Sequence, residues 1–164
     1  MTLRELLAEG EHTLQTAGIG DWKMDAWYLM EEMLHVSRTR YLMEPSKEVS
    51  PEEEMLYKKQ IARRAEHIPL QHLTGHQEFM GLDFQVSEDV LVPRQDTEIL
   101  VEEALKYVHS GMKLLDMCTG SGCILLSIVK LAAELNGCKE VTGTGVDLSE
   151  KALKIAQKNQ RNLG

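Results

Sequence analysis

The stretch Leu114–Ile124, LLDMCTGSGCI, decides the fold of this chain, because it reads as the end of a strand, a tight turn and the start of a helix. Two leucines lead into Asp116, and Gly120 and Gly122 follow within a few positions. A chain that passes directly from strand to helix needs glycines, which adopt unusual backbone angles and let a ligand approach the backbone. The helix then points free N–H groups at that ligand. The pattern therefore predicts a nucleotide-type binding loop.

The segments on both sides of this loop alternate between helix and strand. Helical patterns cover residues 97–108, 122–135 and 149–163, and strand patterns cover 113–118 and 140–148. This order with short links indicates a parallel sheet in a right-handed βαβ unit. We expect the first of the two strands to be buried.

The first part of the chain reads as helices, the last of them ending near His67, and no strand pattern appears before residue 75. Ser50-Pro51, followed by three glutamates, is a strong start signal for the last long helix of this part. The residues expected on the inward face of that helix are Met55, Leu56, Ile61, Ala62 and Ala65. Around Gly81, apolar and polar residues alternate on both sides, which predicts a β-hairpin. A helical bundle and a hairpin linker therefore precede the parallel sheet.

The composition limits the classes of partner. The 164 residues carry a net charge of −8, which argues against binding to a nucleic-acid backbone. No apolar run of about 18 residues occurs and the N-terminus lacks a signal-peptide pattern, so we expect a cytoplasmic protein without a membrane partner. The odd number of cysteines, three, suggests reduced thiols.

No metal site is expected from the histidines and cysteines. Cys118 and Cys123 lack the CxxC spacing of zinc ligands and have no second pair. His72 and His76 are four residues apart but lack the glutamate of a zinc-protease helix. We therefore interpret these four side chains as loop and linker residues.

The residues of the loop favour one ligand class over two others. The dinucleotide pattern requires a third glycine, but Leu125 occupies that position, and no Gly-Lys pair for a phosphate loop occurs. Asp147, at the end of the next strand, can accept hydrogen bonds from ribose hydroxyls. Asp116 suits the cationic sulfonium and ammonium groups of S-adenosylmethionine better than a pyrophosphate. We therefore favour an S-adenosylmethionine site over a purely structural use of the two acids.

Residues 68–105, IPLQHLTGHQEFMGLDFQVSEDVLVPRQDTEILVEEAL, make the interpretation more specific. Together with the loop they resemble the HemK/PrmC family of protein-(glutamine-N5) methyltransferases, above all in EFMGLDF and LVPRQDTE. The resemblance covers essentially the whole chain. It implies an α/β fold with a helical bundle for release-factor docking (1–73), a β-hairpin linker (74–93) and the first part of a Rossmann-like class I S-adenosylmethionine-dependent methyltransferase sheet (94–164).

The resemblance also implies a cofactor, a substrate and their residues. The cofactor is S-adenosylmethionine, and the expected cofactor-binding residues are Cys118, Thr119, Gly120, Ser121, Gly122, Asp116 and Asp147. Phe79 and Arg94 are expected to line the substrate pocket. For Arg94 and Glu98 we leave open whether they hold the PRQDTE segment by an ion pair or hydrogen bonds, or contact a ligand directly. The implied substrate is the glutamine of the Gly-Gly-Gln loop of peptide chain release factors.

Two departures from the family pattern lead to further expectations. Cys118 stands where the family often has glycine, so we expect a negative φ there, and no catalytic use of the thiol. The catalytic Asn-Pro-Pro-Tyr motif is absent, so we expect an N-terminal fragment that is inactive alone. An incomplete sheet has an unpaired edge, which favours dimerisation. Two other functions stay open: a non-enzymatic protein-binding module, and a fragment of an NAD-dependent oxidoreductase.

Overall fold

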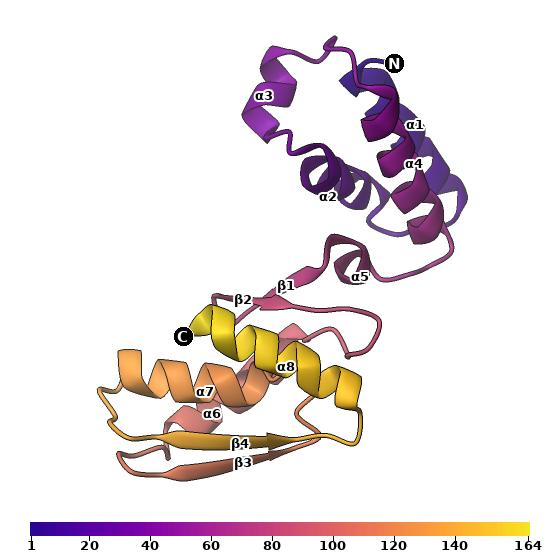
Figure 1. Cartoon of the computed structure of the whole chain (residues 1–164). Coiled ribbons are helices and arrows are strands. Elements are labelled where there is room, and N and C mark those ends of the chain that lie inside the picture. The colour runs from indigo at the N-terminus through magenta and orange to yellow at the C-terminus, as the bar shows by residue number, and fades with distance from the viewer. The chain divides into compact units, whose positions relative to one another are not determined.

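The computed structural model describes all 164 residues, which form two compact units, Met1–Thr74 and Gly75–Gly164 (Figure 1). We call them the helical unit and the α/β unit. None of the helices combines the length and the apolar character that crossing a membrane requires. The predicted fold class, a helical bundle followed by an α/β part, is confirmed.

The helical unit has a core formed mainly by three long helices. Its helices are α1 (Leu3–Thr16), α2 (Trp22–Leu34), α3 (Arg38–Met43), α4 (Pro51–Ala65) and α5 (Leu70–Thr74). Figure 1 shows α1, α2 and α4 side by side, and their apolar faces form one core that includes Leu6, Leu14 and Leu29, all completely buried. The sequence did not predict α5, a short helix whose Leu73 is buried in the same core.

Side-chain caps fix the first residues of α1 and α4. Thr2 and Ser50 each accept a hydrogen bond from the backbone of the glutamate three residues later, and the carboxylates of Glu5 and Glu53 bond back to the cap residues. This capping box satisfies two orphan N–H groups at each helix start. Because the N–H groups of Thr2 and Ser50 donate to these carboxylates and stabilise their charged forms, the pKa values of Glu5 and Glu53 are lowered.

The predicted inward face of α4 is wrong in part. Met55 and Leu56 are exposed, with 71% and 41% of their surfaces accessible, and Ala62 is exposed too. The buried stripe instead runs through Tyr57 and Ile61. The Tyr57 hydroxyl donates to the carbonyl oxygen of Ala26 at 3.1 Å, so this large ring can be buried with its polar atom satisfied. Burial raises the pKa of the Tyr57 hydroxyl far above its usual value.

The α/β unit begins with the predicted hairpin. Strands β1 (His76–Phe79) and β2 (Leu82–Gln85) are antiparallel, and Phe79 is paired with Leu82. The two turn residues, Met80 and Gly81, have φ values of 55° and 72°. Positive φ at both central residues is the geometry that matches the twist of a two-residue hairpin.

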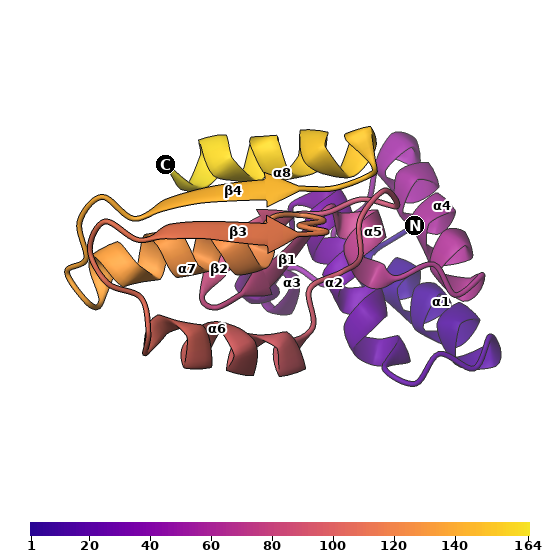
Figure 2. The same cartoon turned by 90° about the horizontal axis from the view of Figure 1, so that it is seen from below.

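The predicted βαβ unit follows the hairpin. Its elements are a 3₁₀ turn (Gln95–Thr97), α6 (Glu98–Leu105), β3 (Lys113–Met117), α7 (Cys123–Glu134), β4 (Thr142–Val146) and α8 (Glu150–Leu163). Strands β3 and β4 are parallel, and Figure 2 shows them side by side with α7 behind them. Gly143 faces α7, and a Cβ there would lie 2.7 Å from Leu125 Cδ1, so the glycine lets the helix pack closely on the sheet.

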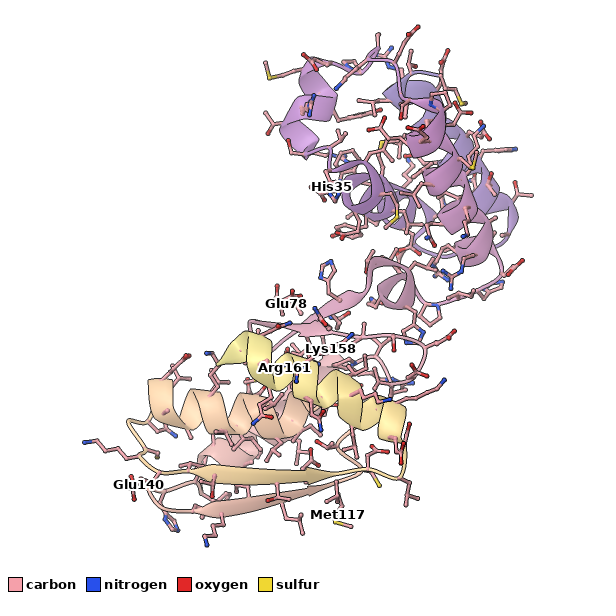
Figure 3. All side chains as sticks on the ribbon, in the orientation of Figure 1. His35, Glu78, Met117, Glu140, Lys158 and Arg161 are labelled. Carbon is pink, nitrogen blue, oxygen red and sulfur yellow. The ribbon has the colours of Figure 1, made fainter.

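The expectation that β3 is buried is wrong for one of its faces. Leu115 and Met117 are 65% and 66% exposed, whereas Leu114 and Asp116, which alternate with them along the strand, are half-buried. Alternate residues of a strand point to opposite sides of the sheet. The helices therefore cover only one side, and Met117 points away from them in Figure 3.

Candidate cofactor site

The glycine loop, Cys118–Gly122, connects β3 to α7, and Asp147 follows directly after β4. Because β3 and β4 are parallel neighbours, both segments lie at the same edge of the sheet. Asp147 Oδ2 accepts a hydrogen bond from the Gly120 N–H at 2.9 Å, and Oδ1 accepts one from the Ser149 N–H at 2.9 Å. The structure thus brings the predicted acid into direct contact with the predicted loop.

These bonds set the charge state of Asp147. The N–H groups of Ser149, Gly120 and Leu148, in that order, lower the pKa of the carboxyl below its ordinary value. The group is therefore ionised at neutral pH. A carboxylate has about four acceptor positions, so these N–H groups leave Asp147 with capacity to accept a further hydrogen bond.

Asp116 and Thr119 are hydrogen-bonded to each other, and Thr119 also connects the loop to β4. The Thr119 hydroxyl donates to Asp116 Oδ2 at 2.7 Å, and the Thr119 N–H donates to the carbonyl oxygen of Val146 at 2.9 Å. A Cβ at Gly145 would lie 2.9 Å from Thr119 Oγ1, so glycine is needed there for Thr119 to pack under the loop. The buried hydroxyl of Thr119 therefore faces Asp116.

The two loop glycines have different roles. Gly122 has a φ of 81°, and a Cβ there would lie 3.0 Å from Leu126 Cδ1 and 3.3 Å from the Cβ of Ala156. Gly120 has a φ of 56°, but a Cβ there would have no atom within 4 Å. Gly122 is thus required by packing, whereas Gly120 leaves open space above the loop.

Helix α7 starts at the loop without a side-chain cap, because its N-cap residue is Gly122. The first N–H groups of a helix have no acceptor within the helix. The N–H groups of Cys123 and Ile124 therefore add partial positive charge at the same edge as the Asp147 carboxylate.

The expectation of a negative φ at Cys118 is wrong: its φ is 63°. The chain must turn sharply between Met117 and Thr119, whose N–H is bonded to β4, and the left-handed conformation accomplishes this turn. The thiol of Cys118 is exposed, and that of Cys123 is buried, which raises its pKa. Burial thus disfavours the reactive thiolate at Cys123.

The other predicted site residues are Phe79, in the hairpin, and Arg94, just before the 3₁₀ turn. Phe79 is buried and packs edge-to-face on Phe84, with ring centroids 6.1 Å apart. Glu98 Oε1 accepts a hydrogen bond from the Met80 N–H at 2.7 Å, so Glu98 fastens the hairpin turn to α6. The structure shows no ion pair between Glu98 and Arg94, whose side chain is exposed. That Phe79 and Arg94 line a substrate pocket stays a prediction.

One site residue was missed by the sequence analysis. Asn159, in α8, is completely buried and donates to the carbonyl oxygen of Ser121, in the middle of the loop, at 2.8 Å. The signal that could have revealed it is a lone amide in the apolar stripe of an amphipathic helix, between Ile155 and Leu163.

The histidines do not form a metal centre with other side chains. His76 Nδ1 lies 3.1 Å from Asp83 Oδ1, across the hairpin. No group of three or more histidine, cysteine, aspartate or glutamate residues is arranged to hold a metal ion.

Comparison with known proteins shows which proteins this chain is similar to. Residues 5–75 match the PrmC N-terminal domain. The whole chain is 39% identical to a release factor glutamine methyltransferase of Moorella thermoacetica, of which it covers 56%. It is 37% identical to one from Geobacter sulfurreducens, where the match covers 99% of this chain and 55% of the relative. A third relative with the same name, from Agrobacterium fabrum, is 36% identical over 98% of this chain and 55% of its own length.

The chain thus spans about half the length of the curated relatives that it matches. The match of its first part to the PrmC N-terminal domain agrees with the helical unit, and the matches to the three relatives extend through the glycine loop to the last helix. This chain is therefore similar over its whole length to release factor glutamine methyltransferases, and its first part is similar to the PrmC N-terminal domain.

Proposed function

We propose that the α/β unit binds S-adenosylmethionine at the glycine loop, as part of an enzyme that methylates the side-chain nitrogen of a glutamine. The observation that carries this proposal is the contact between the Asp147 carboxylate and the Gly120 N–H, which brings the loop and the acid to one edge of the sheet. The relatives, named release factor glutamine methyltransferases, support the choice of reaction.

The residues at the loop fit the groups of this cofactor. Asp147 keeps acceptor capacity beside its bonds to the backbone N–H groups, which suits ribose hydroxyls. Gly120 gives access to the loop backbone, since the space above it is open. Asp116, bonded to Thr119 through one oxygen, supplies negative charge for an ammonium or sulfonium group. Cys118 and Ser121 contribute backbone groups.

S-adenosylmethionine supplies an electrophilic methyl group when bound. The chain's own residues orient and surround it: Asp147 fixes the ribose end, and the loop backbone fixes the amino-acid end. We propose that Phe79 and Arg94 lie near the acceptor, as the resemblance to the family implies. An amide nitrogen is a poor nucleophile, so precise orientation is most of what such a site must provide.

The acceptor's part of the reaction requires residues that are not among these 164. No Asn-Pro-Pro sequence occurs in the chain. We therefore propose that these residues alone do not methylate glutamine, and that the helical unit helps to dock a release factor, its Gly-Gly-Gln loop being the substrate. Release factors act at the ribosome, so the proposal places the protein in the cytoplasm.

Self-association through the sheet is also part of the proposal. The sheet formed by β3 and β4 has only two strands, so each strand has an unpaired edge. Such edges pair readily with another chain. Sedimentation analysis over a range of concentrations tests this point.

Isothermal titration calorimetry with S-adenosylhomocysteine tests the cofactor assignment. We expect binding, and we expect Asp147→Ala to weaken it by about tenfold or more, because two hydroxyl contacts are lost. Asp89→Ala is the matched control, since Asp89 is an acid of the same unit that pairs with Lys151. Tighter binding of NAD than of S-adenosylhomocysteine, or equal effects of the two substitutions, would overturn the assignment.

A further inference from the structure

Asn159 connects three segments through one side-chain amide. Its Oδ1 accepts a hydrogen bond from the Gln85 N–H at 2.7 Å, and its Nδ2 donates to the carbonyl oxygen of Gln85 at 3.0 Å. The same Nδ2 donates to the carbonyl oxygen of Ser121 at 2.8 Å. One side chain in α8 therefore holds the end of β2 and the middle of the glycine loop. All of its bonds join groups within the α/β unit.

The bond to Ser121 fixes one whole peptide plane of the loop. The carbonyl of Ser121 and the N–H of Gly122 belong to the same planar peptide unit. The Gly122 N–H donates to the carbonyl oxygen of Thr119 at 2.8 Å, so both polar groups of this unit have partners. The N–H of Gly120, two residues earlier, donates to Asp147. Asn159 and Asp147 thus restrain neighbouring parts of the loop from two different elements.

Burial makes these bonds strong determinants of geometry. Asn159 is 0% exposed and Ser121 is 2% exposed, so water cannot replace a lost partner without rearrangement. The amide also satisfies both backbone groups of Gln85, as a neighbouring strand would. A residue needed only for packing at this position of an apolar stripe would be aliphatic, as Ile155 and Leu163 are.

We propose that Asn159 is a positioning residue for the cofactor loop: it holds the Ser121 carbonyl so that the loop is preorganised for the ligand. The statement about the ligand rests on the proposed function, but the statement about loop geometry does not. Preorganisation lowers the cost of ordering the loop on binding. Loss of the amide should therefore increase loop opening and weaken ligand binding together.

Amide hydrogen exchange of the full 164-residue chain tests the statement about loop geometry without a ligand. We compare Asn159→Ala and the milder Asn159→Ser with Leu163→Ala, which removes a partly buried apolar side chain one turn later in the same helix. The expected result is exchange at the Gly122 amide, which is bonded to Thr119, about tenfold faster in the Asn159 variants than in Leu163→Ala. Equal exchange in all three variants would overturn the inference.

Calorimetry with S-adenosylhomocysteine tests the statement about the ligand on the same variants. We expect the Kd to rise about tenfold or more for the Asn159 variants, with Leu163→Ala close to wild type at a temperature where all are folded. If Leu163→Ala weakens binding as much, Asn159 acts only through stability and the inference is overturned. If the wild type does not bind the probe at all, the proposed function fails, and the exchange data alone decide the role of Asn159.

Discussion

Cys118 has a strained backbone conformation in the turn after β3. A side chain with a Cβ favours negative φ, yet the turn after β3 places this cysteine at a φ of 63°. The left-handed conformation costs about 1–2 kcal/mol for a residue other than glycine. The hydrogen bond from the Thr119 N–H to the Val146 carbonyl fixes the direction of the chain and so imposes this conformation on Cys118.

Substitutions at Cys118 should reveal this strain. We expect Cys118→Gly to keep the free energy of unfolding within about 1 kcal/mol, because relief of strain offsets the greater freedom of glycine in the unfolded chain. Cys118→Val should lower it by about 1–2 kcal/mol, since a β-branched residue tolerates this conformation least. Hydrogen exchange of the β3 and β4 amides measures the change; tryptophan fluorescence does not, as both tryptophans, Trp22 and Trp27, belong to the helical unit.

Met117→Val serves as the control for Cys118, because it introduces the same side chain at an exposed strand position where β-branching is favourable. Equal stabilities of the two valine variants would contradict the assignment of strain to Cys118.

Ser127 offers a second prediction at the residue scale. Its hydroxyl is buried in α7 without a hydrogen-bond partner. Ser127→Ala should raise the free energy of unfolding by about 1 kcal/mol, because an unpaired buried polar group is removed and alanine favours the helix. Ser149→Ala, which removes the cap bond that the Ala152 N–H donates to the Ser149 hydroxyl at the start of α8, should lower it by about 1 kcal/mol. If Ser127→Ala is destabilising, the hydroxyl has a partner in solution.

At the scale of elements, local chemistry explains why most boundaries could be predicted. Helices begin after Ser50 and Ser149 because these side chains accept hydrogen bonds from the first turn, and Pro51 suits the first position of α4. Met80 and Gly81 form the hairpin turn. These signals act within a few residues. The buried face of α4 could not be predicted, because it depends on the pairing of Tyr57 with Ala26, a residue 31 positions away in the chain.

The same distinction applies to the candidate site. Asp116, Gly120 and Asp147 could be predicted from their positions at strand ends, since parallel strands end at one edge. The hydrogen bonds of Asn159 join residues up to 74 positions apart, so no local pattern assigns them. A buried amide in an apolar stripe is a sign that such a partner exists, but it does not say which.

The bonds of Asp147 give the loop a pH dependence. Backbone N–H groups lower the pKa of Asp147 from its ordinary value of 3.8, so the folded carboxyl is more acidic than the unfolded one. Its contribution to stability is therefore fully present above the unfolded-state pKa, and it is lost as the pH falls through the lower folded-state pKa. Protection of the Gly120 amide from exchange, corrected for the intrinsic rate, should fall in the wild type as the pH drops below 3.8.

Asp147→Asn is the variant that tests this origin. It lacks the titrating group, so its Gly120 protection should be lower at neutral pH and nearly constant across the same range. A parallel decline in both proteins would mean that another group controls the loop.

At the scale of the whole molecule, the two units have separate cores, and the sheet of the α/β unit is covered on one side only. Parallel sheets are normally covered on both faces. Leu115 and Met117 form an apolar strip on the open side. The sequence predicted a buried strand from these residues because their apolar character cannot tell which side of a sheet has a partner.

Polar substitutions on this open strip should change association but not folding. We expect the double variant Leu115→Thr, Met117→Thr to bind less of a hydrophobic dye and to remain monomeric at higher concentration than the wild type, because it exposes less apolar surface. The β propensity of threonine keeps the strand intact. Sedimentation velocity and dye fluorescence measure the two effects. Replacing Leu114, which packs against the core on the other side, should instead destabilise the unit.

The central claim is that the glycine loop and Asp147 form one site for an S-adenosyl ligand. The most direct measurement is a titration of the ¹⁵N-labelled chain with S-adenosylhomocysteine, followed by the amide resonances of every residue. The account predicts saturable shifts concentrated at Cys118–Ile124 and Asp147–Ser149, with little change in the helical unit. Shifts centred elsewhere, or none at ligand concentrations that saturate related sites, would contradict it.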